Sequence, residues 1–223
     1  MKSVQTKSGF IPHDMSVTSG GDLVYATQDE RTVNIVENKI IHVHETIRLK
    51  GLLPTNIYST SCGDVLVAVY DEIEECRVVR YSGSMEKQII QFDSVCQPLY
   101  LSCHYSKNIS ENKNLDICFA DNAASAKMVV IKAGELRFKY TGHSSTSKGL
   151  FYPYGIITDS KSHLLTSDNN NNNCIHILHQ DGQFLRYIEN FDLHHPRLLC
   201  VDMRDNLFVA EWTKGLVKKI KYL

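Results

Sequence analysis

Thiol and imidazole groups gather in the short run Cys174–His179, whose residue types often do chemistry in proteins. Cys174, His176 and His179 carry the sulfur and nitrogen ligands that zinc prefers. Cys174 and His176, however, fall within one predicted strand, and no second pair of ligands follows at the spacing of a zinc site. His194-His195 likewise has no second pair of ligands at the spacing of a zinc site, so we predict no metal site in either place.

Other patterns that could carry catalysis are weak. Serine, histidine and aspartate are abundant, but no Gly-x-Ser-x-Gly motif is present, so a scattered triad is neither supported nor excluded. His42 and His44 share one face of a predicted outer strand, where exposure to solvent is the ordinary interpretation. Lys218, Lys219 and Lys221 are typical of the solvated side of an exposed strand. From the residues alone we predict no catalytic residue, no metal and no cofactor.

Composition excludes several classes of protein. The chain has 223 residues and a formal net charge of -1, which supplies no general attraction for nucleic acid or an anionic membrane. No apolar run is long enough for a signal or a membrane span, so we expect a soluble, cytoplasmic protein without membrane or DNA partners. The seven cysteines lack a Cys-x-x-Cys pair and are interpreted as reduced core thiols. They are Cys62, Cys76, Cys96, Cys103, Cys118, Cys174 and Cys200.

Residues 153–188 form the clearest unit of secondary structure. Four short apolar runs, at 155–158, 163–167, 174–178 and 183–188, are separated by polar turn residues such as Asp181-Gly182. Runs of this length with β-branched and aromatic residues predict four consecutive antiparallel strands. A single sheet of four strands cannot bury both of its faces, so it needs neighbouring sheets of the same kind.

The five prolines mark copies of this unit along the chain. They recur about every 43 residues, with one longer interval of about 55 residues, and each is followed by a similar series of apolar runs. Four strands at this period predict an all-β fold, a β-propeller of four-stranded antiparallel blades in a single domain 1–223. The expected blade units are residues 12–50, 54–93, 98–142, 153–190 and 196–223.

Three stretches depart from the regular repeat. The last unit supplies three strands, and we expect an isolated N-terminal strand at residues 2–6 to complete its blade, which would remove an open edge. The longest interval is explained by a polar insertion, Tyr105–Asn114, interpreted as a surface loop. Asn169–Asn173 is interpreted as a turn between two strands.

The repeat resembles the NHL repeat in its Pro-x-Gly-apolar start, the following Asp, the Asp and Asn between strands and the final Gly-x-Phe, best seen in Pro153–Phe184. The runs LDICFADNAASAKMVVIKAGELRFKYTGHSSTSKG and DNLFVAEWTKGLVKKIKYL resemble the C-terminal propeller of molluscan tripartite-motif (TRIM) NHL proteins. This resemblance implies six blades and a non-catalytic recognition module of a ubiquitin ligase or post-transcriptional regulator. The chain shows no zinc-binding Cys/His array and no heptad run, so we expect no ligase activity of its own.

The resemblance also implies a ligand-binding face, built from the loops that enter the innermost strands and those that join strands two and three. Its Arg, Lys, Tyr, Trp and Asn side chains suit a protein substrate or a single-stranded or stem-loop RNA. The predicted residues are His13, Asp14, Asn56, Tyr100, Tyr154, Arg197, Arg31, Arg77, Asn122, Lys127, Asp168, Asn169, Trp212 and Lys214. Trp212 is the best anchor candidate, although packing against a neighbouring blade explains it equally well.

The alternative function is a propeller hydrolase or lactonase with a divalent metal ion in its central channel. Such an ion prefers a cluster of oxygen ligands. The residues expected at the channel entrance do not form a converging acidic set, and we therefore favour the binding module. The identity of the ligand, a sixth blade and the oligomeric state stay open at this point.

Overall fold

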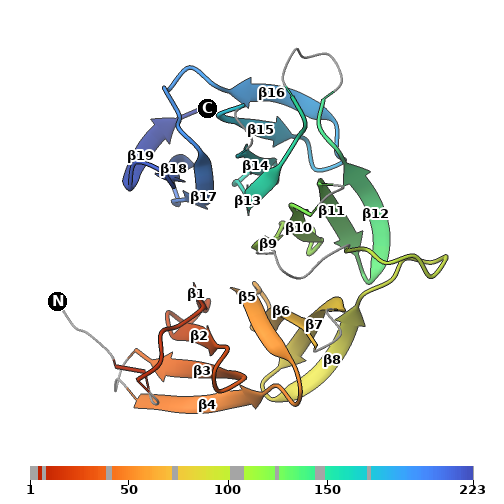
Figure 1. Ribbon diagram of the computed structural model, residues 1–223, viewed down its shortest axis with the longest axis vertical. Helices are drawn as coiled ribbons and strands as arrows, with labels where there is room; N and C mark the ends of the chain where they lie inside the picture. The colour runs from red at the N-terminus through yellow and green to blue at the C-terminus, as the bar shows by residue number, and fades with distance from the viewer. Residues whose placement is uncertain are drawn as a thin grey trace. The chain divides into compact units, whose positions relative to one another are not determined.

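The computed structural model describes residues 5–6, 9–38, 42–71, 75–100, 108–123, 126–143, 149–169 and 172–222. These residues form five antiparallel sheets, and no helix occurs among them (Figure 1). The chain divides into two compact units, Met1–His104 and Tyr105–Leu223. Within this part of the chain, no helix is long and apolar enough to cross a membrane.

The first unit contains two four-stranded sheets, in the strand orders β1-β2-β3-β4 and β5-β6-β7-β8. The strands of these sheets follow one another directly in the chain, as a meander requires. They are β1 (Asp14–Val17), β2 (Leu23–Thr27), β3 (Thr32–Glu37), β4 (His42–Arg48), β5 (Leu53–Ser59), β6 (Val65–Tyr70), β7 (Cys76–Ser82) and β8 (Met85–Ile90).

The second unit contains two four-stranded sheets and one three-stranded sheet, in the orders β12-β11-β10-β9, β13-β14-β15-β16 and β17-β18-β19. Strand β13 contacts both β9 and β17, so the first strands of the three sheets lie side by side. The strands are β9 (Asn108–Glu111), β10 (Ile117–Asp121), β11 (Lys127–Lys132), β12 (Glu135–Tyr140), β13 (Pro153–Thr158), β14 (Leu164–Asp168), β15 (Cys174–Leu178), β16 (Phe184–Ile188), β17 (Pro196–Val201), β18 (Asn206–Glu211) and β19 (Leu216–Lys221).

The sheets are propeller blades because they bury apolar side chains on both faces. Leu164 packs with Cys118 and Met128 of the preceding blade, whereas its neighbour Leu165 packs with Leu207 of the following blade. Successive residues of a strand point to opposite faces, so one strand serves two interfaces. The prediction of an all-β propeller with five blade units, the last of three strands, is confirmed.

The repeated Asp or Asn of the sequence pattern closes the first turn of the blades in the second unit. Asp159 accepts hydrogen bonds from the backbone N–H groups of Lys161 and His163, at 2.9 and 2.8 Å from its Oδ1 atom. Asp202 and Asn112 accept the same pair of N–H groups, two and four residues on. A short polar side chain that bonds its own backbone in this way stabilises a turn.

One sequence expectation is wrong in detail, and a second falls mostly outside the described residues. The expected surface loop Tyr105–Asn114 contains β9, whose residues Ile109, Ser110 and Glu111 are buried. The sequence of β9 is polar, as in a loop, and therefore did not predict a strand. The segment is nevertheless the first strand of its blade, and most of its side chains are buried. At the N-terminus, residues 1–4 lie outside the described residues, so the strand expected at 2–6 stays a prediction, although Gln5 and Thr6 do not belong to a strand.

The expectation of reduced core thiols is also wrong for part of the set. Cys76 is bonded in a disulfide, and Cys103 lies outside the described residues. Among the described thiols only Cys118 and Cys174 are buried, and burial raises the pKa of the Cys118 thiol. The free thiols of Cys62, Cys96 and Cys200 are exposed. Cys62 and Cys96 lie in turns, whereas Cys200 lies in β17, a strand that leaves alternate residues in solvent.

Gly155 is required where β13 meets β17. A Cβ atom at this position would lie 2.3 Å from the Arg197 carbonyl oxygen, so the backbone itself would have to move. We expect Gly155→Ala to destabilise the protein by about 1–3 kcal/mol, as overpacking of a dense core does. Chemical denaturation measures this loss. Gly149→Ala is the control, because its Cβ would meet no atom within 4 Å, and an equal loss in both variants would contradict the account.

Glu211 makes folding stability depend on pH. Burial acts to raise the pKa of its carboxyl, but the N–H of His194 and the ammonium group of Lys218 outweigh burial and lower it. A carboxyl with a lowered folded-state pKa stabilises the fold above its ordinary pKa of 4.5 and loses this contribution as the pH falls below it. We expect Glu211→Gln to lose less stability than wild type between pH 5 and pH 3 in urea titrations. Parallel losses would contradict this role.

Candidate functional site

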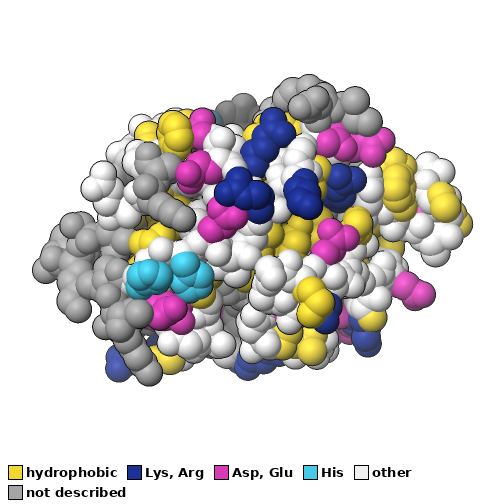
Figure 2. Space-filling model, turned by 90° about the horizontal axis from the view of Figure 1, so that it is seen from below, with side chains coloured by type: hydrophobic (Ala, Val, Ile, Leu, Met, Phe, Trp, Pro, Cys, Tyr) yellow, Lys and Arg dark blue, Asp and Glu magenta, His cyan; other side chains and the backbone are white. Residues whose placement is uncertain are grey.

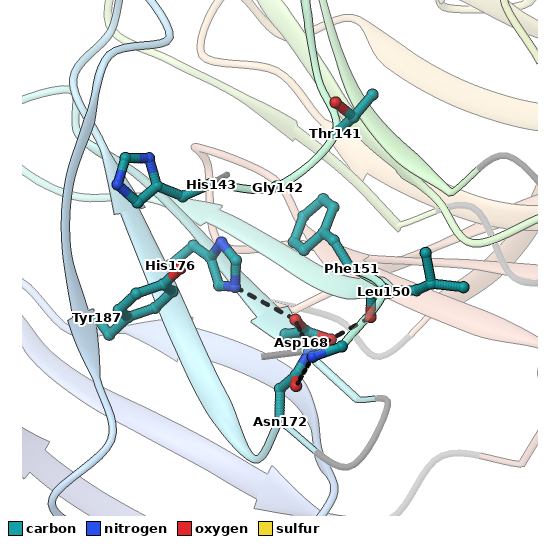
Figure 3. A pocket seen from close by; sticks show the side chains of 10 residues that line it. Thr141, Gly142, His143, Leu150, Phe151, Asp168, Asn172, His176 and Tyr187 are labelled. Atoms are coloured by element: carbon teal, nitrogen blue, oxygen red, sulfur yellow. Dashed lines mark hydrogen bonds and ion pairs between the residues drawn. The ribbon is translucent and has the colours of Figure 1, made fainter. Parts of the chain in front are cut away.

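One pocket, of about 300 Å³, opens in the second unit beside the β13–β16 blade (Figure 3). We call it the His176 pocket. Its wall combines the end of the preceding blade, the segment that enters β13 and the connection from β14 to β15. The lining residues are Thr141, Gly142, His143, Gly149, Leu150, Phe151, Asp168, Asn172, His176 and Tyr187.

His176 lies in the middle of β15 and is held by a shell of aromatic rings. Its side chain is 3% exposed, and its backbone pairs with Thr166 on one side and Tyr187 on the other. The centroids of the Phe151 and Tyr187 rings lie 4.7 and 4.8 Å from that of the imidazole. Phe184 and Tyr140 complete the shell at 6.1 and 5.8 Å. Close packing of this kind fixes the orientation of the imidazole.

The hydroxyl of Tyr140 determines which nitrogen of His176 carries the proton. It lies 2.9 Å from Nδ1 of His176, and burial, followed by the charges of Tyr187 and Asp168, raises the pKa of Tyr140, which keeps the hydroxyl protonated. Nδ1 is the hydrogen-bond partner of this buried hydroxyl within the described residues, so we assign the hydroxyl as the donor and Nδ1 as the acceptor. The neutral imidazole therefore carries its own proton on Nε2.

Asp168 faces the protonated side of the imidazole. Its Oδ2 atom lies 3.3 Å from Nε2 of His176 and accepts a hydrogen bond from Nδ2 of Asn172 at 2.7 Å. Its Oδ1 atom accepts the backbone N–H of Tyr152 at 3.1 Å. These donors hold the carboxylate, whereas Nε2 makes no hydrogen bond to any described residue. A buried ring nitrogen that faces a carboxylate at a pocket wall is a candidate for contact with a ligand.

The buried donor atoms beside the pocket include a set of three that could face one metal ion. Asp168, Cys174 and His176 place ligand atoms within 4.8 Å of one another. Metal coordination by His176 at this point would need a lone pair on Nε2, but the hydrogen bond from Tyr140 assigns a proton to that atom. The buried set therefore does not fit a metal ion in the observed arrangement. A second set, Glu37, His42 and His44, lies at the surface of the first unit.

The channel metal of the alternative hypothesis would need oxygen ligands at Asp14 and Asn56. The structure brings these two residues together, but the amide Nδ2 of Asn56 donates to Oδ2 of Asp14 at 3.1 Å. The N–H of Ile57 donates to the same oxygen at 2.9 Å. Burial raises the pKa of Asp14 against these hydrogen bonds. The pair is thus satisfied within the protein and does not fit a cation.

Three predicted residues of the second unit meet in one stack. The guanidinium of Arg197 lies 4.2 Å from the centroid of the Tyr154 ring and 3.7 Å from that of Trp212. It also donates a hydrogen bond to the Tyr154 hydroxyl. Trp212 is 66% exposed, so it is a surface side chain and not a buried packing residue. Asn169 is another predicted residue. Its carbonyl oxygen lies 3.3 Å from Nδ1 of His195, which precedes Arg197 by two residues in the chain.

The remaining predicted residues are dispersed. In the second unit, Lys127 is buried in β11, Asn122 is half-buried and Lys214 is an exposed turn residue. In the first unit, His13 lies next to Asp14 and its ring faces Nε2 of Gln28 at 3.4 Å. The other three predicted residues of the first unit are Tyr100, Arg31 and Arg77. Tyr100 is buried, Arg31 is a half-buried turn residue and Arg77 pairs with Asp71 at 3.9 Å.

Sequence reasoning identified Asp168 but overlooked its partners. Tyr140, Phe151 and Tyr187 come from three other segments, and His176 was considered only as a zinc ligand. One signal was available. A histidine in an otherwise apolar strand, shortly after an aspartate that ends the preceding strand, places the two side chains within one hairpin.

No family model and no curated protein matches the chain. Solved structures match its fold. A streptogramin B lyase superposes with a TM-score of 0.67 at 15% identity, over 94% of this chain and 68% of that one. A catalytically inactive histidine-to-alanine variant of virginiamycin B lyase from Staphylococcus aureus, with quinupristin, gives 0.69 at 17% identity, over 100% and 73%. A gluconolactonase from Xanthomonas campestris gives 0.60 at 15% identity, over 88% and 68%.

These likenesses establish a β-propeller and correct the functional expectation. The expectation that the chain is not an enzyme is contradicted, because the propellers that share its fold include lyases and a gluconolactonase. The gluconolactonase among them belongs to the class that the alternative hypothesis named, propeller hydrolases and lactonases. The resemblance to TRIM NHL proteins is supported only at the level of the propeller fold, and nothing in these matches supports RNA binding or ubiquitination.

Proposed function

We propose that the chain is an enzyme of the propeller hydrolase or lyase class and that the His176 pocket is its reaction site. The observation that carries this proposal is the chain of buried groups Tyr140–His176–Asp168 at the pocket wall. It holds one imidazole in one tautomer, with the Nε2 proton next to a carboxylate. Acid and base groups held in fixed positions at a pocket wall are what proton transfer to a bound substrate requires.

Each group has a distinct role in this proposal. The N–H at Nε2 of His176 gives its proton to the carbonyl or leaving oxygen of an ester, and Nε2 takes a proton back from Asp168, so the imidazole is neutral before and after the step. Asp168 also accepts the proton from an attacking water or from the substrate carbon. Tyr140 is a positioning residue, because it acts on the substrate only through His176.

The pocket favours a small, uncharged, ring-shaped substrate. Its volume of about 300 Å³ lies at the lower end of the range for small-molecule sites. None of the ten residues that line it is Lys or Arg, so it offers no cation for a phosphate or carboxylate. The rings of Phe151 and Tyr187 supply apolar walls. A lactone, which is a cyclic ester, meets these conditions.

The test is a turnover assay with defined probes. Purified protein is incubated with five- and six-membered sugar lactones and with quinupristin, the compound bound to one of the similar structures. The proposal predicts ring opening of at least one probe, together with shifts of His176 and Tyr187 resonances when that probe is added. Absence of both turnover and binding for every probe would overturn it.

A second candidate function is binding of a protein or RNA, as in TRIM NHL proteins, at the stack of Tyr154, Arg197 and Trp212. The exposed ring of Trp212 and the guanidinium beside it favour this proposal. Crosslinking from cells with wild type and with Trp212→Ala tests it. Recovery of the same partners by both forms would contradict a role for this stack.

A further inference from the structure

We propose that Glu37, His42 and His44 form a binding site for a divalent transition-metal ion, of which zinc is the reference case. The three side chains offer one carboxylate oxygen and two imidazole nitrogens, and these atoms all lie within 4.8 Å of one another. This site is separate from the His176 pocket, because it belongs to the first unit of the chain.

The strand register brings the three side chains to one face. Glu37, the last residue of β3, pairs directly with His42, the first residue of β4. Directly paired residues share a face of the sheet, and His44 returns to that face two residues on. A histidine at every second position of a strand therefore gives two imidazoles on one face next to a carboxylate, as three ligands of one ion require.

The observed distances agree with this geometry. Nδ1 of His44 lies 3.6 Å from Oε1 of Glu37, which is beyond a hydrogen bond but suited to two ligands of one ion. The ring centroids of His42 and His44 are 5.8 Å apart. No other hydrogen bond or ion pair of these three side chains occurs within the described part of the chain. Their ligand atoms are thus not committed to other groups among the described residues.

The site is open to solvent. The side chains of Glu37 and His44 are 43% and 42% exposed, and His42 is exposed. Figure 2 shows the surface from the side on which β4 lies, with two histidine side chains next to an acidic one. Three protein ligands leave at least one coordination position for water or for another ligand.

The donor atoms determine the class of ion. Imidazole nitrogen with one carboxylate suits Zn²⁺, Ni²⁺ and Cu²⁺, whereas Ca²⁺ and Mg²⁺ prefer sites made of oxygen atoms alone. We expect affinity to rise from Ni²⁺ to Cu²⁺ and to be lower for Zn²⁺ than for Cu²⁺. Ca²⁺ is expected not to compete.

The experiment uses the full chain without a histidine tag, after treatment with a chelator. Isothermal titration with ZnCl₂ is compared for wild type, Glu37→Gln and the double variant His42→Ala/His44→Ala. We expect one equivalent of zinc in wild type, at least about tenfold weaker binding in Glu37→Gln and loss of that equivalent in the double variant. A rise of the wild-type melting temperature with zinc, absent in the double variant, gives a second readout.

His179→Ala is the matched control. The His179 side chain is 41% exposed and lies next to one carboxylate, with Nδ1 3.2 Å from Oδ2 of Asp181, but it is not part of a three-ligand set in the described residues. The variant should bind zinc as wild type does. Retention of the zinc equivalent by the double variant, or its loss in His179→Ala, would overturn the proposal.

Discussion

Substitution of His176 by glutamine is expected to lower kcat about 100-fold to 10,000-fold on any probe that the wild-type protein converts, as loss of a general acid does. Glutamine retains a polar side chain that can accept from the Tyr140 hydroxyl, but it cannot exchange a proton. Steady-state kinetics measures the effect. The fold should persist, because the surrounding rings of Phe151 and Tyr187 keep their own packing.

The role of Tyr140 provides an independent check on this prediction. Tyr140→Phe removes the hydroxyl that holds the proton of His176 on Nε2, while it keeps the ring in place. We expect a smaller loss of kcat than in His176→Gln and an altered pH profile, because both tautomers of the imidazole become accessible. A purely structural role of Tyr140 would change stability but leave the shape of the pH profile unchanged.

Replacement of Arg137 by alanine is expected to cost about 3–5 kcal/mol of folding free energy, the cost of leaving a buried charge without its partner. Nη1 of Arg137 lies 2.6 Å from Oδ2 of Asp116, whose side chain is fully buried. The guanidinium also donates to the carbonyl of Gln180, at 3.1 Å, and to Asp181. It therefore joins the β9–β12 blade to the next blade as well as neutralising Asp116.

The matched control for Arg137→Ala is Arg48→Ala. Arg48 pairs with Glu45 at 2.5 Å, but its side chain is 63% exposed, and exposed ion pairs contribute only about 0–1 kcal/mol. Urea denaturation of both variants at pH 7 compares the two costs. If they are equal, Arg137 does not have the structural role that its contact with Asp116 indicates.

The strands could be predicted where local pattern and tertiary position agree. The run Cys174–Leu178 was predicted with the bounds that β15 has, because apolar residues bounded by Asn and His/Gln turns define it without outside information. Asn108–Glu111 was misassigned for the opposite reason. Its composition is that of a loop, and only contact with β10 and β13 makes it the strand β9.

The pocket could be predicted only in part. Asp168 was identified from its position at a connection between strands, whereas the contact between Tyr140 and His176 joins residues from two blades. Sequence periodicity defines which residues share a strand face but not which rings meet across a blade interface. The solved propellers were likewise needed to correct the expectation of a non-catalytic module.

The most direct test of the central claim, that His176 is the proton-transferring group of the pocket, is kcat/KM for wild type, His176→Gln and His179→Gln on one lactone. His179 follows the last residue of β15 and does not line the pocket, so it is the matched control. We predict that kcat/KM falls at least about 100-fold in His176→Gln and stays within about twofold of wild type in His179→Gln. Equal values for wild type and His176→Gln would contradict the claim.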